Sequence, residues 1–239
     1  MRLTTDDYLA FTVAMVAAVV TAIASIEALP VLLTMDLGGG QIAWYAARAS
    51  GMIAYVLATA SVLFGIATSA RLGGRVLGKG NIADAHRALS LLTLIAIGAH
   101  ALFLSLDSYA DFGLSDLFVP LATSYRPLWT GLGIVAAYVI VVVYVSFYIR
   151  PLIGFKAWRA FHYLAFAVFG LGAAHGIMAG ADTHAALALA LYAGTIATVL
   201  AMLVYRVEFR SPVANTRTSD RPAAENEAAV AALASPQKL

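Results

Sequence analysis

The chain has 239 residues, of which 62% are hydrophobic and 12% are charged, and its formal net charge is +2. A soluble domain carries about 25% charged residues, so this composition excludes a soluble globular protein and indicates a helical membrane protein. Arginine and lysine stand in short clusters between apolar runs, which excludes a nucleic-acid-binding face and predicts no nucleic-acid partner. The lack of cysteine excludes disulfides, thiolate ligands, iron–sulfur clusters and thiol catalysis.

Six apolar runs of about twenty residues or more predict an all-α fold, a polytopic six-helix bundle that crosses the membrane. Their approximate bounds are 8–33, 43–69, 84–106, 128–149, 158–179 and 184–205. Two aspartates precede the first run and no small-residue cleavage site follows it, so we interpret it as a retained helix rather than a signal peptide. Glu27, near the far end of this run, is a functional candidate because of its charge, although contact with interfacial water also explains it.

The charges between the runs predict the orientation of the bundle. The connections 70–83 and 150–157 and the segment after residue 205 are basic, whereas the opposite connections carry most of the aspartates. Basic loops stay in the cytoplasm. The pattern therefore predicts that both termini are cytoplasmic.

Two regions outside the runs have a composition of their own. In the connection 107–127, apolar residues at helical spacing predict a short interfacial helix on the outer surface. These residues are Leu114, Leu117, Phe118 and Leu121. After residue 209 the chain is polar, alanine-rich and punctuated by proline, which predicts a membrane domain over 1–209 and a disordered cytoplasmic tail over 210–239, with a weak helix over 222–234.

Four of the five histidines lie inside two of the runs at nearly equal spacing. His86 and His100 are fourteen positions apart, which on a helix corresponds to about 21 Å of rise and about 40° of rotation. His162 and His175 are thirteen positions apart, with a similar rise but about 140° of rotation. We expect the two glycines between them to bend that helix and so to absorb the difference.

The predicted topology pairs these histidines by depth. The runs that carry them cross the membrane in the same direction, so His86 and His162 lie at the basic inner side, and His100 and His175 lie about 20 Å further out. An imidazole in hydrocarbon must satisfy both ring nitrogens or cost several kcal/mol. Binding of iron satisfies one nitrogen and uses neutral histidine. We therefore expect each pair to occupy both axial positions of one haem, so that the chain holds two haems stacked across the bilayer.

Other roles for membrane histidines stay open at this point. They also serve in helix–helix hydrogen bonds and in proton pathways, so the rival interpretations are a haem-free proton-coupled transporter that uses Glu27 as well, and a haem-free scaffold subunit. Small residues flank the histidines, as a flat macrocycle between helices requires, but they also serve ordinary helix packing. His184, at the start of the last run, has no partner at matching spacing, and we assign it to the surface.

Arginines at the two levels are candidates to bind the propionates of such haems, because propionates are anions. Arg48 and Arg126 are the outer candidates, and Arg87 and Arg159 are the inner ones. Each of them also has an ordinary role as a determinant of topology or as a contact of lipid phosphate.

In these features the chain resembles a known family. Histidines fourteen and thirteen apart in the third and fifth of six helices are similar to those of the haem-binding membrane domain of ferric reductases and NADPH oxidases. They are also similar to those of the haem-binding membrane subunit that supports bacterial periplasmic methionine sulfoxide reductase. The resemblance covers about residues 40–205. Supporting stretches are Ala47-Arg48-Ala49-Ser50-Gly51, His86-Arg87, Tyr125-Arg126-Pro127-Leu128-Trp129 and Trp158-Arg159-Ala160-Phe161-His162-Tyr163.

The resemblance implies an electron carrier of the bacterial inner membrane with two b-type haems. It implies that His86 and His162 hold the inner haem, that His100 and His175 hold the outer one, and that Arg48 lies near the outer one. Electrons would enter from a cytoplasmic flavin and leave to an external acceptor, which could be ferric iron, dioxygen, a quinone or a periplasmic protein.

The chain also departs from the full-length members of that family. It has no glycine-rich nucleotide fingerprint and no room for a Rossmann unit, so it is not expected to carry its own flavin or nicotinamide domain. A separate cytoplasmic flavoprotein reductase or a quinone is therefore expected as the donor, and membrane lipid as the surrounding partner.

Overall fold

The computed structural model describes residues 42–70, 79–107 and 112–208. These residues form helices and their connections. In chain order the helices are α2 (Ile42–Ala70), α3 (Lys79–Ser105), α4 (Leu114–Phe118), α5 (Pro127–His162), α6 (Leu164–Ala179) and α7 (Ala186–Glu208). The first predicted run over 8–33, which includes Glu27, and the predicted tail over 210–239 lie outside the described residues.

Four helical stretches are long and apolar enough to cross a membrane. They are Ile42–Ala70, Gly80–Leu106, Pro127–Ala179 and Ala186–Glu208. Within the described residues, these stretches confirm the expected all-helical membrane class. The number of crossings in the whole chain and the side of the membrane on which the termini lie stay predictions.

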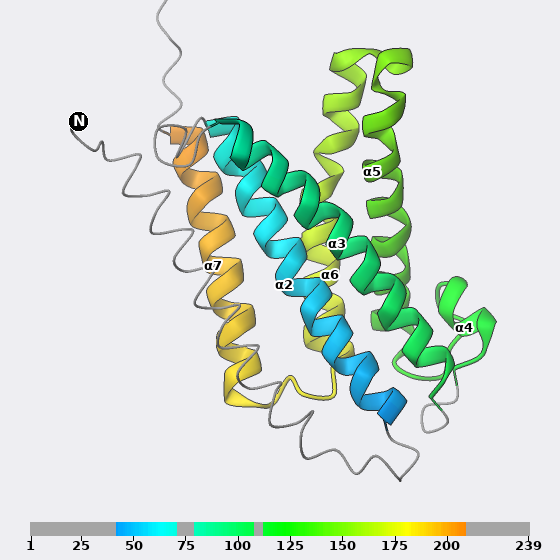
Figure 1. Cartoon of the computed structure of the whole chain (residues 1–239). Coiled ribbons are helices and arrows are strands. Elements are labelled where there is room, and N and C mark those ends of the chain that lie inside the picture. The colour runs from blue at the N-terminus through cyan, green and yellow to red at the C-terminus, as the bar shows by residue number, and fades with distance from the viewer. Residues whose placement is uncertain (1–41, 71–78, 108–111, 209–239) are drawn as a thin grey trace, which may run out of the picture.

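The third of these stretches is 53 residues long and reverses its direction. Gly154 has φ 81° and ψ 157°, a conformation that is essentially restricted to glycine, and Pro151 just before it has no N–H group to continue the helical hydrogen bonds. Figure 1 shows the result, two limbs that run antiparallel on either side of the reversal. The limbs cover the predicted runs 128–149 and 158–179.

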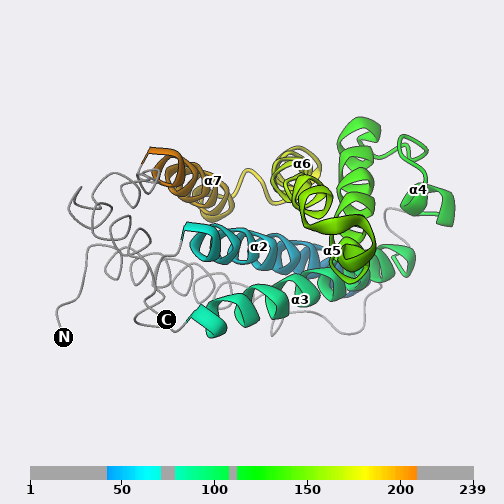
Figure 2. The same cartoon turned by 90° about the horizontal axis from the view of Figure 1, so that it is seen from above.

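Helix α2 lies at the centre of the described bundle. Figure 2 shows it between α3 on one side and α6 and α7 on the other. One buried cluster unites Leu63 and Ile66 of α2 with Val199 and Met202 of α7, and a second joins α2, α6 and α7 around Tyr55. Helix α2 therefore packs against α3, α6 and α7, whereas α5 packs mainly against α6.

The directions of the helices agree with the predicted pairing by depth. In Figure 1, α3 and α6 run the same way, and α2 runs opposite to both. The short helix α4 lies in the connection between α3 and α5, where an interfacial helix is predicted. It exposes 72% of Leu114 and 57% of Phe118, which suits a position at a lipid surface.

Candidate functional site: two pairs of facing histidines

The structure brings the four membrane histidines together in the predicted pairs. The ring centroids of His86 and His162 are 5.9 Å apart, and those of His100 and His175 are 6.3 Å apart. In both pairs the ring planes are close to perpendicular, at 83° and 74°. His184, by contrast, is exposed in the turn before α7, as expected.

The rotational mismatch between His162 and His175 is absorbed at a helix junction. His162 is the last residue of α5, and α6 begins at Leu164. At Tyr163 between them, the backbone N–H donates to the carbonyls of Arg159 and Ala160 together, and the regular helical pattern is interrupted. Helix α6 is continuous through its glycines, so the interruption between the two histidines lies at this junction and not at the glycines.

Three of the four histidines are held by backbone carbonyls of a neighbouring helix. Nδ1 of His86 lies 2.8 Å from the carbonyl oxygen of Ser61. Nδ1 of His100 lies 2.7 Å from the carbonyl oxygen of Ala47, and Nδ1 of His175 lies 2.9 Å from that of Trp129. A carbonyl oxygen only accepts hydrogen bonds, so each Nδ1 carries a proton. In the neutral ring, Nε2 then keeps its lone pair. Metal-binding histidines in proteins show this same arrangement, with one nitrogen donating to a carbonyl and the other facing the metal.

A glycine makes room for each of these three rings. A methyl group on Gly51 would lie 2.9 Å from Nδ1 of His100, and one on Gly133 would lie 2.6 Å from Nδ1 of His175. On Gly65 it would lie 3.2 Å from Cε1 of His86. All three distances are shorter than an ordinary contact between such atoms. The glycines therefore let the imidazoles approach the helix backbone.

The glycines follow one rule of position. Each stands four residues after the residue whose carbonyl accepts the histidine bond: Ala47 and Gly51, Ser61 and Gly65, Trp129 and Gly133. In an α-helix, residue i+4 lies directly over the carbonyl of residue i, so a side chain there would cover the acceptor.

The sequence itself carries a signal of this arrangement. Gly51 and Gly65 of α2 are fourteen positions apart, and so are His86 and His100 of α3. Because α2 and α3 are antiparallel, the first glycine meets the second histidine, and the second glycine meets the first histidine. The equal spacing of these glycines and histidines could therefore have predicted which carbonyls of α2 accept the histidine hydrogen bonds.

His162 has a different environment. Its ring stacks on Trp158, with centroids 5.1 Å apart and an angle of 26° between the planes. Among the described residues, no hydrogen bond joins its ring nitrogens to a neighbour, and the buried Nε1 of Trp158 also has no hydrogen-bond partner there. Trp158 is a second site residue that the sequence analysis mentioned only as part of a supporting stretch.

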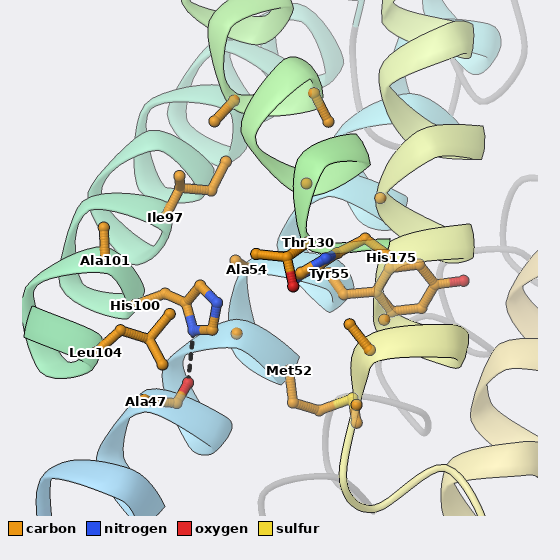
Figure 3. A pocket seen from close by; sticks show the side chains of 18 of the residues that line it. Ala47, Met52, Ala54, Tyr55, Ile97, His100, Ala101, Leu104, Thr130 and His175 are labelled. Carbon is orange, nitrogen blue, oxygen red and sulfur yellow. Dashed lines mark hydrogen bonds between the residues drawn. The ribbon is translucent and has the colours of Figure 1, made fainter. Parts of the chain in front are cut away.

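A cavity of about 260 Å³ adjoins His100 and His175, the pair that is predicted to lie on the outer side. Side chains of α2, α3, α5 and α6 line it, and most of them are apolar or small. Figure 3 shows His100 and His175 facing it from different helices, with Tyr55 and Met52 nearby. A single water needs about 10–15 Å³ measured in this way, so the cavity is large enough for a much larger group.

The four predicted arginines occupy different environments. Arg48 lines the outer cavity and forms an ion pair with Asp182, to which its Nε donates at 2.7 Å. Arg126 instead donates to the carbonyl of Met178 at 2.7 Å, at the end of α6. Of the outer candidates, Arg48 therefore faces the cavity, whereas Arg126 binds a helix terminus, where cations are favoured.

The two inner arginines are exposed. Arg87 pairs with Asp84 at 3.1 Å on the surface of α3. Arg159 lies with its Nη2 3.5 Å from the hydroxyl of Tyr163, next to His162 in the chain. Their role as partners of the inner site stays a prediction.

Each histidine pair offers two ligands, fewer than a bare metal ion takes. Among residues 42–70, 79–107 and 112–208, no three His, Asp or Glu side chains are grouped to hold an ion. Proteins bind structural and catalytic metal ions with three or four ligands, so two histidines need a group that supplies the rest. A porphyrin supplies four nitrogens and leaves two axial positions.

The ring separations support the same fit. Two imidazoles that bind one metal from opposite sides, with metal–nitrogen bonds of about 2.0–2.1 Å, have centroids about 6.3 Å apart. The observed separations are 5.9 and 6.3 Å. Perpendicular ring planes are compatible with this, because each imidazole can rotate about its own bond to the metal.

Comparison of the chain with protein-family models, with curated proteins and with solved structures gave no match in any of the three.

Proposed function

We propose that this chain is a di-haem cytochrome b that carries electrons across a membrane. One observation supports the proposal best. In each of the two pairs, a histidine of α3 faces a histidine of the α5–α6 limb, and their rings are separated by the distance that two axial ligands of one iron would need. In three of these four rings the hydrogen bond on Nδ1 leaves the lone pair on Nε2. Iron in haem, when bound, supplies reversible one-electron chemistry.

The residues of the chain would do three things for such a group. Each histidine pair would hold one haem, and the two haems would lie at depths about 20 Å apart by helix rise. The apolar lining of the outer cavity would exclude water. Arg48, the charged residue of α2 in that lining, would neutralise an acidic substituent at its edge.

Each proposed site would use one histidine from α3 and one from the α5–α6 limb. Two histidines on one haem would leave no coordination position open for a substrate, which would favour electron transfer over chemistry on the metal. An external acceptor would then receive electrons without binding to iron. The proposed direction is outward, from a separate cytoplasmic flavoprotein or a quinone to ferric iron, dioxygen, a quinone or a periplasmic protein.

The hydrogen bonds also weigh against the rival proton relay. A histidine that passes a proton through its ring takes it up on one nitrogen and releases it from the other. The Nδ1 atoms of His86, His100 and His175 donate to carbonyls that have no proton to exchange. This fixed pattern suits a ligand rather than a proton carrier.

Transfer across sealed vesicles tests the proposal. The purified chain, expressed with ample haem supply, is reconstituted into liposomes that contain ferricyanide, and dithionite is added outside. We expect the trapped ferricyanide to be reduced, and we expect this to fail in liposomes that carry His175→Ala, in which one site loses a ligand. Equal rates for the two proteins and for empty liposomes would refute the proposal.

A further inference from the structure

The two histidine pairs differ in the groups that surround the Nδ1 protons. In the outer pair, the described partner of each Nδ1 is a single backbone carbonyl, of Ala47 or of Trp129. In the inner pair, Nδ1 of His86 lies 2.8 Å from the carbonyl oxygen of Ser61 and also 3.1 Å from its hydroxyl oxygen. A side-chain hydroxyl beside the Nδ1 proton of a histidine is therefore a feature of the inner site.

The proton positions in this hydroxyl cluster follow from its partners. The hydroxyl of Ser90 lies 2.8 Å from the carbonyl oxygen of His86, which only accepts, so Ser90 donates there. The hydroxyl of Ser61 lies 2.8 Å from that of Ser90, whose proton is already used, so Ser61 donates to Ser90. The oxygen of Ser61 then presents its lone pairs to Nδ1 of His86. The hydroxyl protons of Ser61 and Ser90 then each have one acceptor, and the Nδ1 proton of His86 is shared between the carbonyl and hydroxyl oxygens of Ser61.

These hydrogen bonds would make the imidazole of His86 a more basic ligand. Hydrogen bonds from Nδ1–H to an acceptor raise the basicity of a ligand imidazole. Donation from Ser61 to Ser90 makes the Ser61 oxygen a better acceptor, since hydrogen bonds in a chain polarise one another. A more basic ligand stabilises ferric over ferrous iron and so lowers the midpoint potential.

We propose that Ser61 and Ser90 are positioning residues that lower the midpoint potential of the inner haem through the Nδ1 proton of His86. This rests on the proposed function, because it requires that His86 is an axial ligand. The effect is confined to the inner site, since the described hydrogen-bond partners of Nδ1 in His100 and His175 are backbone carbonyls.

Ser61→Ala is a clean probe of this proposal. Ser61 is buried, with 7% of its surface exposed. Without its hydroxyl, Ser90 still donates to the carbonyl of His86, and Nδ1 of His86 still donates to the Ser61 carbonyl. The substitution therefore leaves no buried donor without a partner and removes only the second acceptor.

The experiment is an optical redox titration in the His100→Ala background, in which only the inner haem is expected to remain. One hydrogen bond corresponds to about a fivefold change in an equilibrium constant, so Ser61→Ala should shift the ferric–ferrous equilibrium about fivefold toward ferrous. For a one-electron couple this is a rise of roughly 40 mV. Ser61→Thr keeps the hydroxyl and should stay near the parent value.

A matched control and a second variant keep the test decisive. Ser146→Ala removes a buried serine hydroxyl whose partner is the carbonyl of Val143 in its own helix, and it should not change the potential. If Ser61→Ala loses its haem, Ser90→Ala carries the test, because it removes the acceptor of the Ser61 proton and should raise the potential by a smaller amount.

The possible failures are distinguishable. Full haem content with an unchanged or lower potential in Ser61→Ala, or an equal shift in Ser146→Ala, would overturn the role of the serines and leave the cytochrome intact. A parent protein without haem would instead refute the proposed function itself.

Discussion

Gly133→Ala should remove the outer haem selectively. The added methyl group would lie 2.6 Å from Nδ1 and 2.8 Å from Cε1 of His175, well inside van der Waals contact, so the ring would have to move. The movement would break the 2.9 Å hydrogen bond from Nδ1 of His175 to the carbonyl oxygen of Trp129. Overpacking of this kind costs about 1–3 kcal/mol and a lost hydrogen bond about 1 kcal/mol, so outer-haem affinity should fall by about 2–4 kcal/mol, or roughly 30-fold to 1,000-fold.

The assay is haem content per chain together with the reduced-minus-oxidised spectrum. Wild type should contain two haems and Gly133→Ala one. Gly98→Ala is the matched control, because a methyl group there meets nothing within 4 Å, and replacing a helical glycine by alanine stabilises the helix by about 0.5–1 kcal/mol. Two haems with a wild-type spectrum in Gly133→Ala would refute the reasoning, and so would equal haem loss in both variants.

Three further predictions concern other residues of the bundle. His86→Ala should lose the inner haem and His175→Ala the outer one, as measured by which component of a redox titration disappears; loss of the same component in both would contradict the pairing. Arg48→Gln should weaken outer-haem retention more than Asp182→Asn, and Asp182→Asn should change the free energy of unfolding by less than about 1 kcal/mol, because the ion pair is part-exposed. Tyr55→Phe should destabilise the bundle by about 0.6–1.5 kcal/mol in a detergent unfolding assay, because it removes a buried 2.6 Å hydrogen bond to a threonine of α7; an unchanged midpoint would show that this bond contributes nothing.

The pairing of the histidines could be predicted from the sequence because it depends on features that survive without coordinates. Helix rise relates His86 to His100, and loop charge predicts that the two histidine-bearing helices run in the same direction. Helix rise and helix direction together are enough to predict which histidines lie at the same depth in the membrane. The reversal of the chain near Gly154 was also expected in outline, since the apolar runs on either side are separated by a basic connection over 150–157.

The environment of the rings could not be predicted in the same way. The carbonyl that accepts the hydrogen bond from His175 is determined by the rotation of α5 relative to α6. The spacing of residues within one helix gives no information about that rotation. The junction at Tyr163 is a second case, because the sequence offered glycines as the more obvious place for a bend. Asp182 was counted only as a charge outside the membrane, and its contact with Arg48 required the fold of the α6–α7 connection.

The glycines show where sequence reasoning could have gone further. Their role needs no coordinates beyond the idea that a histidine donates to a helix carbonyl and that residue i+4 covers that carbonyl. Gly51 and Gly65 repeat the spacing of His86 and His100. A search for equal spacings of histidine and glycine on successive helices would have found this pair.

Haem quantitation on the purified chain, after expression with ample haem supply, distinguishes a di-haem cytochrome from a haem-free protein. The pyridine haemochrome spectrum and the protein concentration of one sample give the number of haems per chain. We predict two b-type haems per chain, falling to one in each single histidine variant. A colourless protein, or a haem content that none of the four substitutions changes, would contradict it.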